Sequence, residues 1–334
     1  MASVPEVSVI VPTRSRPALV CRAVRGALAQ TVTNIEVIVV VDGPDQETIG
    51  ALSAIRDHRV RAVELPAPGG APTARNHGVR LARAAWTALL DDDDEWLPEK
   101  LAVQLKLAAA TSVPTPIVAS RLINRTPRAD LVVPRRLPDP DQPISEYLTV
   151  RHGLFHGDGF VQTSTILTPT ELLRRVPFIP ELRRLQELDW TLRAVQHDGV
   201  ALIVAPEPLV IWNTDEDRPR ITFDSPWEES LGWLQRSRPL FTRRAYAAIT
   251  MSVISSMAAP TRSVTAFRTL LREARRHGQP GALDYLTFLQ IWLTPAQLRR
   301  RVRDLMLKRR RPAGGTLADR PAAPAEPLAG RRAD

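Results

Sequence analysis

The chain has 334 residues, long enough for one large α/β domain with an added helical part or for two modest domains. Hydrophobic residues make up 44% and charged residues 24%, which excludes an intrinsically disordered chain. The 45 basic and 36 acidic residues leave a net charge of +9, which favours anionic partners such as nucleic acid, nucleotide phosphates or an acidic membrane surface.

The first 125 residues alternate between short β-branched runs and segments with helical spacing of apolar residues, the pattern of repeated βα units. The run at 35–41 is almost continuously apolar, as expected for a parallel strand covered on both faces. The predicted strands are 7–11, 35–41, 60–65, 86–90 and 116–123, and the predicted helices begin at 17, 46, 73 and 98.

The rest of the chain is less regular. Residues 124–150 are rich in Pro, Asp and Arg and predict an irregular excursion, followed by a strand at 162–167, a helix at 186–196 and a strand at 200–205. Residues 227–311 are mostly helical in pattern, and the composition after Pro312 is typical of a disordered terminus.

Cys21 is the single cysteine, so no internal disulfide can form. The first residues lack the basic and apolar regions of a signal peptide, and no run approaches the roughly 18 apolar residues of a membrane span. We expect a cytoplasmic protein, with peripheral attachment to the inner face of the cytoplasmic membrane left open.

The fourth predicted strand runs directly into four aspartates and Glu95, which would repel one another without a compensating cation. A divalent ion is the simplest compensation, and hard carboxylate oxygens suit Mg²⁺ or Mn²⁺. The carboxyl ends of strands in an open α/β sheet are also where ligands bind. The alternative is a solvated acidic turn that caps the next helix.

Two further loops lie on the same predicted edge. Asp42 follows the second strand, and Gly69-Gly70 precedes a helix that carries Arg75. Free backbone N–H groups and a guanidinium both favour a diphosphate. Taken singly, Asp42 could cap a helix and Arg75 could be a surface charge, so the shared edge is what points to a phosphate site.

These residues resemble family 2 glycosyltransferases over the first 125 residues. The resemblance rests on four segments in the family's order: Ser8 to Arg14, Val40 to Gly43, Gly70 to Gly78 and Leu89 to Asp94. It implies a GT-A fold, Rossmann-like and α/β with a mostly parallel sheet flanked by helices, here with a helical C-terminal extension. It also implies metal-dependent, inverting transfer of a sugar from a nucleotide diphosphate donor to a glycan, lipid-linked or other hydroxyl acceptor, in cell-wall, polysaccharide or glycoconjugate synthesis.

Domain boundaries follow from the same comparison and the composition. We expect a nucleotide-sugar-binding half at 1–125, an acceptor and catalytic half of the same domain at 126–222, a helical region at 223–311 and a disordered tail at 312–334.

The resemblance also implies site residues. The nucleotide sugar would contact Pro12, Thr13, Arg14, Asp42, Arg75, Asp91 and Asp92, and the divalent Mg or Mn ion would be held by Asp91 and Asp93.

A second landmark of the family is an acidic pair on a helix, followed by an aromatic residue and an arginine, which supplies the catalytic base. Here it reads Gln186-Glu187-Leu188-Asp189-Trp190 and continues to Arg193, with glutamate where the family more often has aspartate. The base is therefore either Glu187 or Asp189, unless both acids are only surface charges of the helix. Such a base must reach the acceptor hydroxyl.

Near the end of the chain, Leu298, Val302 and Leu305 share one helical face beneath many arginines that extend to Arg311. This helix could lie on an anionic membrane or pack as a solvated basic helix on the main domain.

Other classes fit the sequence less well. No DNA- or RNA-binding motif accompanies the positive charge, so we expect no nucleic-acid partner. A dehydrogenase would need Gly-x-Gly-x-x-Gly after the first strand, where Pro12-Thr13-Arg14 stands instead. A sugar nucleotidyltransferase and a non-catalytic GT-A-fold scaffold remain as rivals, and the sequence names neither the sugar, nor the nucleotide, nor the acceptor.

Overall fold

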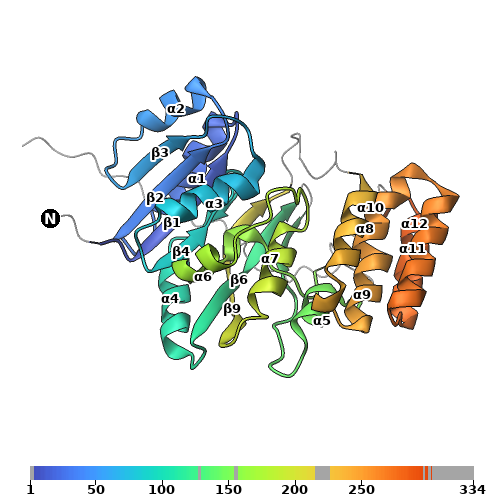
Figure 1. The fold of residues 1–334 in the computed structure, drawn as a ribbon. Helices are drawn as coiled ribbons and strands as arrows, with labels where there is room; N and C mark the ends of the chain where they lie inside the picture. The colour runs from blue at the N-terminus through green and yellow to red at the C-terminus, as the bar shows by residue number, and fades with distance from the viewer. Residues whose placement is uncertain are drawn as a thin grey trace, which may run out of the picture.

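The protein is described here by a computed structural model, which covers residues 4–126, 129–153, 157–214, 226–295, 298, 299 and 302. Within these residues the central element is a nine-stranded mixed sheet in the order β3-β2-β1-β4-β8-β6-β9-β5, with β7 paired to β6. Helices flank the sheet, and a helical region lies beside it (Figure 1). The predicted α/β fold with a helical C-terminal extension is confirmed.

The N-terminal half of the sheet is parallel, as predicted, because its strands alternate with helices. β1 and β2 are buried along their whole length, in keeping with their unbroken apolar sequence. The elements of this half are β1 (Val7–Thr13), α1 (Pro17–Leu28), β2 (Ile35–Val41), α2 (Gln46–Ser53), β3 (Val60–Glu64), α3 (Gly70–Leu81) and β4 (Trp86–Leu89).

Helix α3 lies very close to the sheet at Gly78. A Cβ atom on Gly78 would come within 2.5 Å of the Ile10 side chain and 3.2 Å of the Val40 side chain, so only glycine allows this approach. The contact fixes the height of α3 over β1 and β2 and thereby the position of Arg75, one turn earlier on the helix.

The second half mixes strand directions. β8 runs antiparallel to β4 and β6, whereas β6 and β9 pair in parallel over most of their length. The elements are β5 (Glu95–Trp96), α4 (Lys100–Ala110), β6 (Thr115–Thr126), β7 (Ala129–Val133), α5 (Ile144–Thr149), the 3₁₀ turn η1 (Thr163–Thr165), β8 (Leu167–Pro169), α6 (Thr170–Arg175), α7 (Gln186–Ala194) and β9 (Val200–Asn213).

Two local predictions in this half were wrong. The excursion at 124–150 contains the β6–β7 hairpin and α5, so it is not irregular throughout. The predicted strand at 162–167 is largely η1, because the Gln162 side chain accepts a hydrogen bond from the Ser164 N–H and tightens the backbone into a turn. Strand pairing begins only at Leu167.

The C-terminal region is helical, as predicted. Its elements pack around their own core, which includes Trp233, Tyr246 and Phe288. They are α8 (Trp227–Arg236), η3 (Arg238–Leu240), α9 (Arg243–Ile249), the π-helical η4 (Thr250–Ile254), α10 (Ser255–Ala258), η5 (Ala259–Thr261), α11 (Val264–His277) and α12 (Ala282–Leu293). Across the described ranges, no helix is both long and apolar enough to span a membrane.

Two sequence predictions lie outside the described residues. Of the basic helix ending at Arg311, only Leu298, Arg299 and Val302 are described, and the proposed tail at 312–334 is not described at all.

Candidate active site

The candidate site lies at the edge of the sheet where β1, β2 and β4 end. The acidic run at 91–94 follows β4 directly, and Thr13 and Asp42 stand at the ends of β1 and β2. Parallel strands bring their carboxyl ends to one edge, which is why residues far apart in the sequence meet here.

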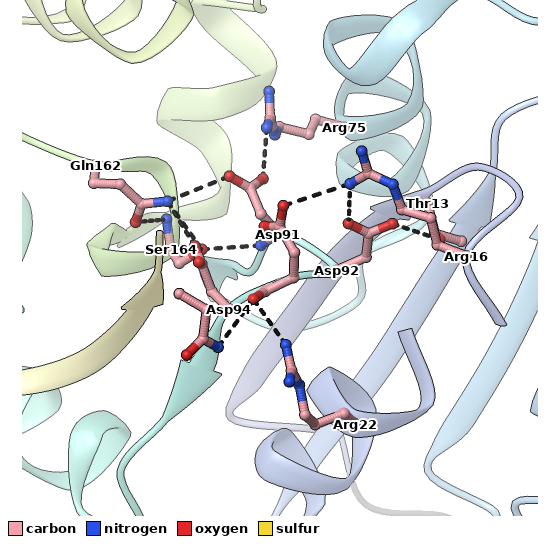
Figure 2. Close-up of polar contacts among 11 residues, drawn as sticks. Thr13, Arg16, Arg22, Arg75, Asp91, Asp92, Asp94, Gln162 and Ser164 are labelled. Carbon is pink, nitrogen blue, oxygen red and sulfur yellow. Dashed lines mark hydrogen bonds and ion pairs between the residues drawn. The ribbon is translucent and has the colours of Figure 1, made fainter. Parts of the chain in front are cut away.

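Arg75 connects the acidic run to helix α7. It is 4% exposed, so it is not the surface charge that the sequence left open. One terminal nitrogen donates to Asp91 Oδ1 at 2.6 Å (Figure 2). The other donates to Gln186 Oε1 at 2.6 Å. The guanidinium bridges two residues and so holds the end of β4 and the start of α7 at a fixed separation.

Asp92 faces the end of β1. Thr13 Oγ1 donates to one of its oxygens at 2.8 Å, and Arg16 Nη1 lies 3.1 Å from the other (Figure 2). Burial raises the pKa of Asp92 to about 6, with Asp93 acting in the same direction and Arg16 opposing the shift.

Asp93 and the residues beside it also contact arginines of α1 and its N-terminal loop. Arg16 Nη1 lies 3.4 Å from the Asp93 carboxylate, and Arg22 donates to the Asp93 backbone carbonyl at 3.2 Å. The Asp93 side chain is 23% exposed, as is that of Asp91, so both carboxylates border the surface of the site.

Asp94, the last aspartate of the run, is fully buried. Ser164 Oγ donates to its Oδ2 at 2.6 Å and Gln162 Nε2 at 2.7 Å, while its Oδ1 has no hydrogen-bond partner in the described part of the chain. Burial raises its pKa well above the usual range, and the charges of Asp93 and Asp91 add to this. Ser164 Oγ also receives the Asp91 N–H at 3.0 Å, so one hydroxyl ties both ends of the run to η1.

Asp42 binds the backbone at the start of helix α3. Its two carboxylate oxygens accept hydrogen bonds from the Gly69 and Gly70 N–H groups at 2.7 and 2.9 Å. Pro12 is buried in β1. Within the described part of the chain, Arg14 is exposed and takes no part in these contacts.

The two acids of α7 have different surroundings. Asp189 is 1% exposed and accepts hydrogen bonds from Trp233 Nε1 and from Arg193, both at 2.8 Å, so it is not a surface charge. Glu187 is half-buried, and no side chain among the described residues donates a hydrogen bond to it. Burial raises the pKa of Glu187, and Arg75 opposes this shift while Asp91 adds to it.

Leu185, which precedes α7, has φ of 61°, in the left-handed region. Non-glycine residues adopt this conformation only where the surrounding structure enforces it, and such residues cluster at functional sites. Here the turn brings Gln186 to Arg75 and Glu187 into the same neighbourhood.

Several members of the site were not predicted from the sequence. Arg16 and Arg22 supply part of the positive charge that the acidic run requires, and Gln162 and Ser164 support the run from below. Arg16 could have been found, since it stands between β1 and α1 at the predicted ligand edge, whereas Gln162 was assigned to a strand.

Comparison with known proteins agrees with the predicted family. Residues 8–163 match the family described as Glycosyl transferase family 2. The matched part of the chain contains Thr13, Arg75 and the acidic run.

The chain is 37% identical over 107 residues to the succinoglycan biosynthesis protein ExoO of Rhizobium meliloti, which is 32% of this chain and 31% of that protein. It is 31% identical over 99 residues to WfaP of Escherichia coli, named as a UDP-Glc:alpha-D-GlcNAc-diphosphoundecaprenol beta-1,3-glucosyltransferase, covering 30% of this chain and 39% of that protein. The matched segments thus span a third or so of these relatives' own length.

Among solved structures, the chain is similar to S. aureus TarS 1-349 in complex with UDP-GlcNAc. The TM-score is 0.53 at 14% sequence identity, over 89% of this chain and 92% of that one. The similarity extends through the helical region and identifies the fold as GT-A.

The acidic run offers carboxylate oxygens as possible metal ligands. In the ranges that the structure describes, no group of three or more His, Cys, Asp or Glu side chains is arranged to hold a metal ion. The hard oxygens of Asp91 and Asp93 at the surface of the run suit Mg²⁺ or Mn²⁺, ions that take one or two carboxylates and complete their shell with water and substrate phosphates. The donor set therefore fits an ion that binds together with a diphosphate.

Proposed function

We propose that this protein transfers a sugar from a nucleotide diphosphate sugar to an acceptor hydroxyl with inversion at the anomeric carbon. The observation that carries the proposal is the double contact of Arg75 with Asp91 and Gln186. It links the acidic run to the first turn of α7, which carries Glu187, and this supports a shared site for the two parts that inverting transfer would require.

In this proposal the nucleotide diphosphate lies along the strand ends of the N-terminal half. Arg16 and Arg75 supply positive charge there, and Thr13 and Asp92 form the floor near the end of β1. A divalent Mg or Mn ion held by Asp91 and Asp93 would neutralise charge on the departing diphosphate. Asp42 would shape the site through the Gly69-Gly70 turn.

Glu187 is the proposed general base. No side chain in the described part of the chain donates a hydrogen bond to Glu187, so its carboxylate would be available to accept a proton from an acceptor hydroxyl. Both oxygens of Asp189 are already occupied by Trp233 and Arg193, which supports a positioning role for that residue.

The relatives suggest the setting of the reaction. ExoO is named for succinoglycan biosynthesis, and WfaP is named for transfer to a diphosphoundecaprenol-linked sugar. We accordingly propose a role in polysaccharide or glycoconjugate synthesis with a lipid-linked acceptor, in the cytoplasm and in peripheral contact with the inner face of the membrane.

A donor screen tests this proposal. The purified protein would be incubated with Mn²⁺ or Mg²⁺ and a panel of UDP-, GDP- and dTDP-sugars, and release of the nucleoside diphosphate would be followed by mass spectrometry. We expect release from one donor class, increased by an acceptor. If no nucleotide sugar binds or is turned over, the protein is not a transferase and the scaffold alternative is favoured.

A further inference from the structure

The outward face of α12 is apolar. Tyr285, Leu286, Leu289 and Leu293 are 36%, 53%, 45% and 76% exposed, and their spacing places them on one side of the helix. The opposite side of α12 is also apolar, with Phe288 and Ile291 buried in the helical core. A helix at the surface of a globular domain is expected to be polar on its outward side, so this face needs another explanation.

The neighbouring helix α11 presents the complementary pattern. Its inward residues include the buried Leu270 and Ala274, and its exposed residues form a basic stripe of Arg268, Arg272, Arg275 and Arg276. Phe267 of α11 packs on Phe288 and Trp292 of α12, with ring centroids 4.8 and 5.4 Å apart.

The two helices lie side by side at the end of the molecule farthest from the N-terminal strands (Figure 1). The ring contacts form the seam between them, and both helices bury their inward residues in the same core. The apolar stripe of α12 and the basic stripe of α11 therefore form one continuous outer surface, which we call the α11–α12 face.

The positive charge of the α11–α12 face limits which partner can bind to it. A second copy of the chain would bring two basic stripes close together, which like-charge repulsion disfavours. The tail at 312–334 offers only Leu317 and Leu328 as large aliphatic residues, too few to cover the stripe. The sequence from 299 to 311 adds eight Lys or Arg residues against the single Asp304, which extends the preference for an anionic partner.

We propose that the α11–α12 face docks on an anionic lipid bilayer. Tyr285, Leu286, Leu289 and Leu293 enter the boundary between headgroups and acyl chains, and the arginines of α11 lie among the anionic headgroups. This inference rests on the peripheral membrane contact of the proposed function, and it assigns that contact to a surface separate from the basic segment ending at Arg311.

Flotation of the full chain with vesicles tests the proposal. Vesicles of phosphatidylcholine with phosphatidylglycerol should carry the protein, and pure phosphatidylcholine vesicles should carry much less. The double variant Leu289→Gln/Leu293→Gln should lower the partition coefficient about tenfold or more, since two apolar side chains no longer gain from burial. The control Val132→Gln/Val4→Gln, at positions 45% and 72% exposed, should float like the wild type.

A second pair of variants tests the charge. Arg268→Gln/Arg272→Gln should reduce binding roughly fivefold per arginine at low salt, and the difference should shrink as salt screens the headgroups. Arg25→Gln/Arg56→Gln, at exposed positions of the nucleotide-binding half, is the matched control.

The outcomes separate the alternatives. If Leu289→Gln/Leu293→Gln floats like the wild type, the α11–α12 face does not bind lipid. If the same variant instead converts a dimer into a monomer in light scattering, without any lipid dependence, the face is an interface between copies and the proposal is wrong. Turnover with a water-soluble acceptor should be unchanged in these variants. Failure of the wild type to bind or turn over any nucleotide sugar would overturn the transferase proposal and leave the lipid result standing.

Discussion

The acidic run after β4 and the acid pair of α7 meet through Arg75, and each divides its carboxylates between interior and surface. In the run, Asp94 is fully buried while Asp91 and Asp93 border the site. In α7, Asp189 is 1% exposed and Glu187 is half-buried without a side-chain donor in the described part of the chain. Asp94 and Asp189 are therefore buried, although each is close in sequence to an acid proposed to act in the site.

The interior acids are stabilised in different ways. Asp189 is paired with the Arg193 guanidinium and accepts a hydrogen bond from the Trp233 indole. Among the described residues, Asp94 receives hydrogen bonds from the neutral donors Ser164 and Gln162, and burial raises its pKa. Acids that are close in sequence can therefore have different roles. Substitution of a buried acid should mainly lower stability, whereas substitution of an acid at the surface of the site should mainly lower activity.

The largest effect should come from removing the divalent ion. Excess EDTA should abolish donor turnover, since the donor diphosphate would lose the divalent cation that Asp91 and Asp93 are proposed to hold beside it. Asp93→Ala should imitate chelation with little change in thermal stability, because its side chain is at the surface of the site. Turnover assays with and without Mn²⁺ provide the measurement, with the exposed Glu171→Ala as control. Full activity in EDTA would show that the run has no metal.

Replacing the proposed base should have the next largest effect. Glu187→Gln keeps size and hydrogen-bonding capacity but removes the carboxylate, so glycosyl transfer should fall by roughly 10²- to 10⁴-fold while donor binding persists. Transfer rates and donor affinity, measured separately, make the test. Retention of near-native transfer by Glu187→Gln, together with its loss in Asp189→Asn at unchanged donor affinity, would move the assignment to Asp189. If neither change matters, the inverting mechanism proposed for α7 is wrong.

The parts of this arrangement that the sequence predicted are those that depend on local pattern. The apolar runs of β1 and β2 give buried parallel strands, and their ends define the ligand edge. The position of Arg16 at the ligand edge could be predicted in the same way, but its contact with Asp92 could not, because it joins residues 76 positions apart in the sequence. Gln162 was read as part of a strand because its neighbours Thr163, Thr165 and Ile166 are β-branched, while its side-chain contact with the Ser164 N–H favours a turn.

The difference between Glu187 and Asp189 could not be read from spacing either. It depends on Trp233, which comes from α8 in the helical region and donates to Asp189 across 44 residues of sequence. The exposed apolar face of α12 could not be predicted for the same reason. The sequence predicts a helix there, but tertiary packing decides which of its apolar sides the core covers.

A stability effect of intermediate size is expected at Asp189. Asp189→Asn keeps an acceptor for Trp233 but removes the charge that pairs with Arg193, so the free energy of unfolding should fall by about 1–3 kcal/mol. Transfer should fall less than in Glu187→Gln. Urea denaturation and the transfer assay, run on the same preparations, decide the matter. Unchanged unfolding would show that the buried pair does not stabilise the junction of α7 and α8.

The smallest expected effect concerns Glu187 and pH. Burial raises the folded-state pKa of Glu187 above its usual 4.5, so the folded protein binds this proton more tightly than the unfolded chain. The contribution of Glu187 to stability is therefore fully present below pH 4.5 and is lost as pH rises through the folded-state pKa. Glutamine carries no charge at any pH and escapes this loss.

Glu187→Gln should thus unfold at a temperature equal to or slightly above that of the wild type at pH 8, by about 2 °C at most, and without advantage near pH 4.5. Differential scanning calorimetry across this range, with Glu171→Gln as an exposed control, measures the difference. A Glu187→Gln variant less stable than the wild type at pH 8 would mean that the charged carboxylate is stabilised in the folded protein, as Asp189 is. The contrast between the two acids of α7 would then fail, because a glutamate held by stabilising contacts is poorly suited to accept a proton from an acceptor.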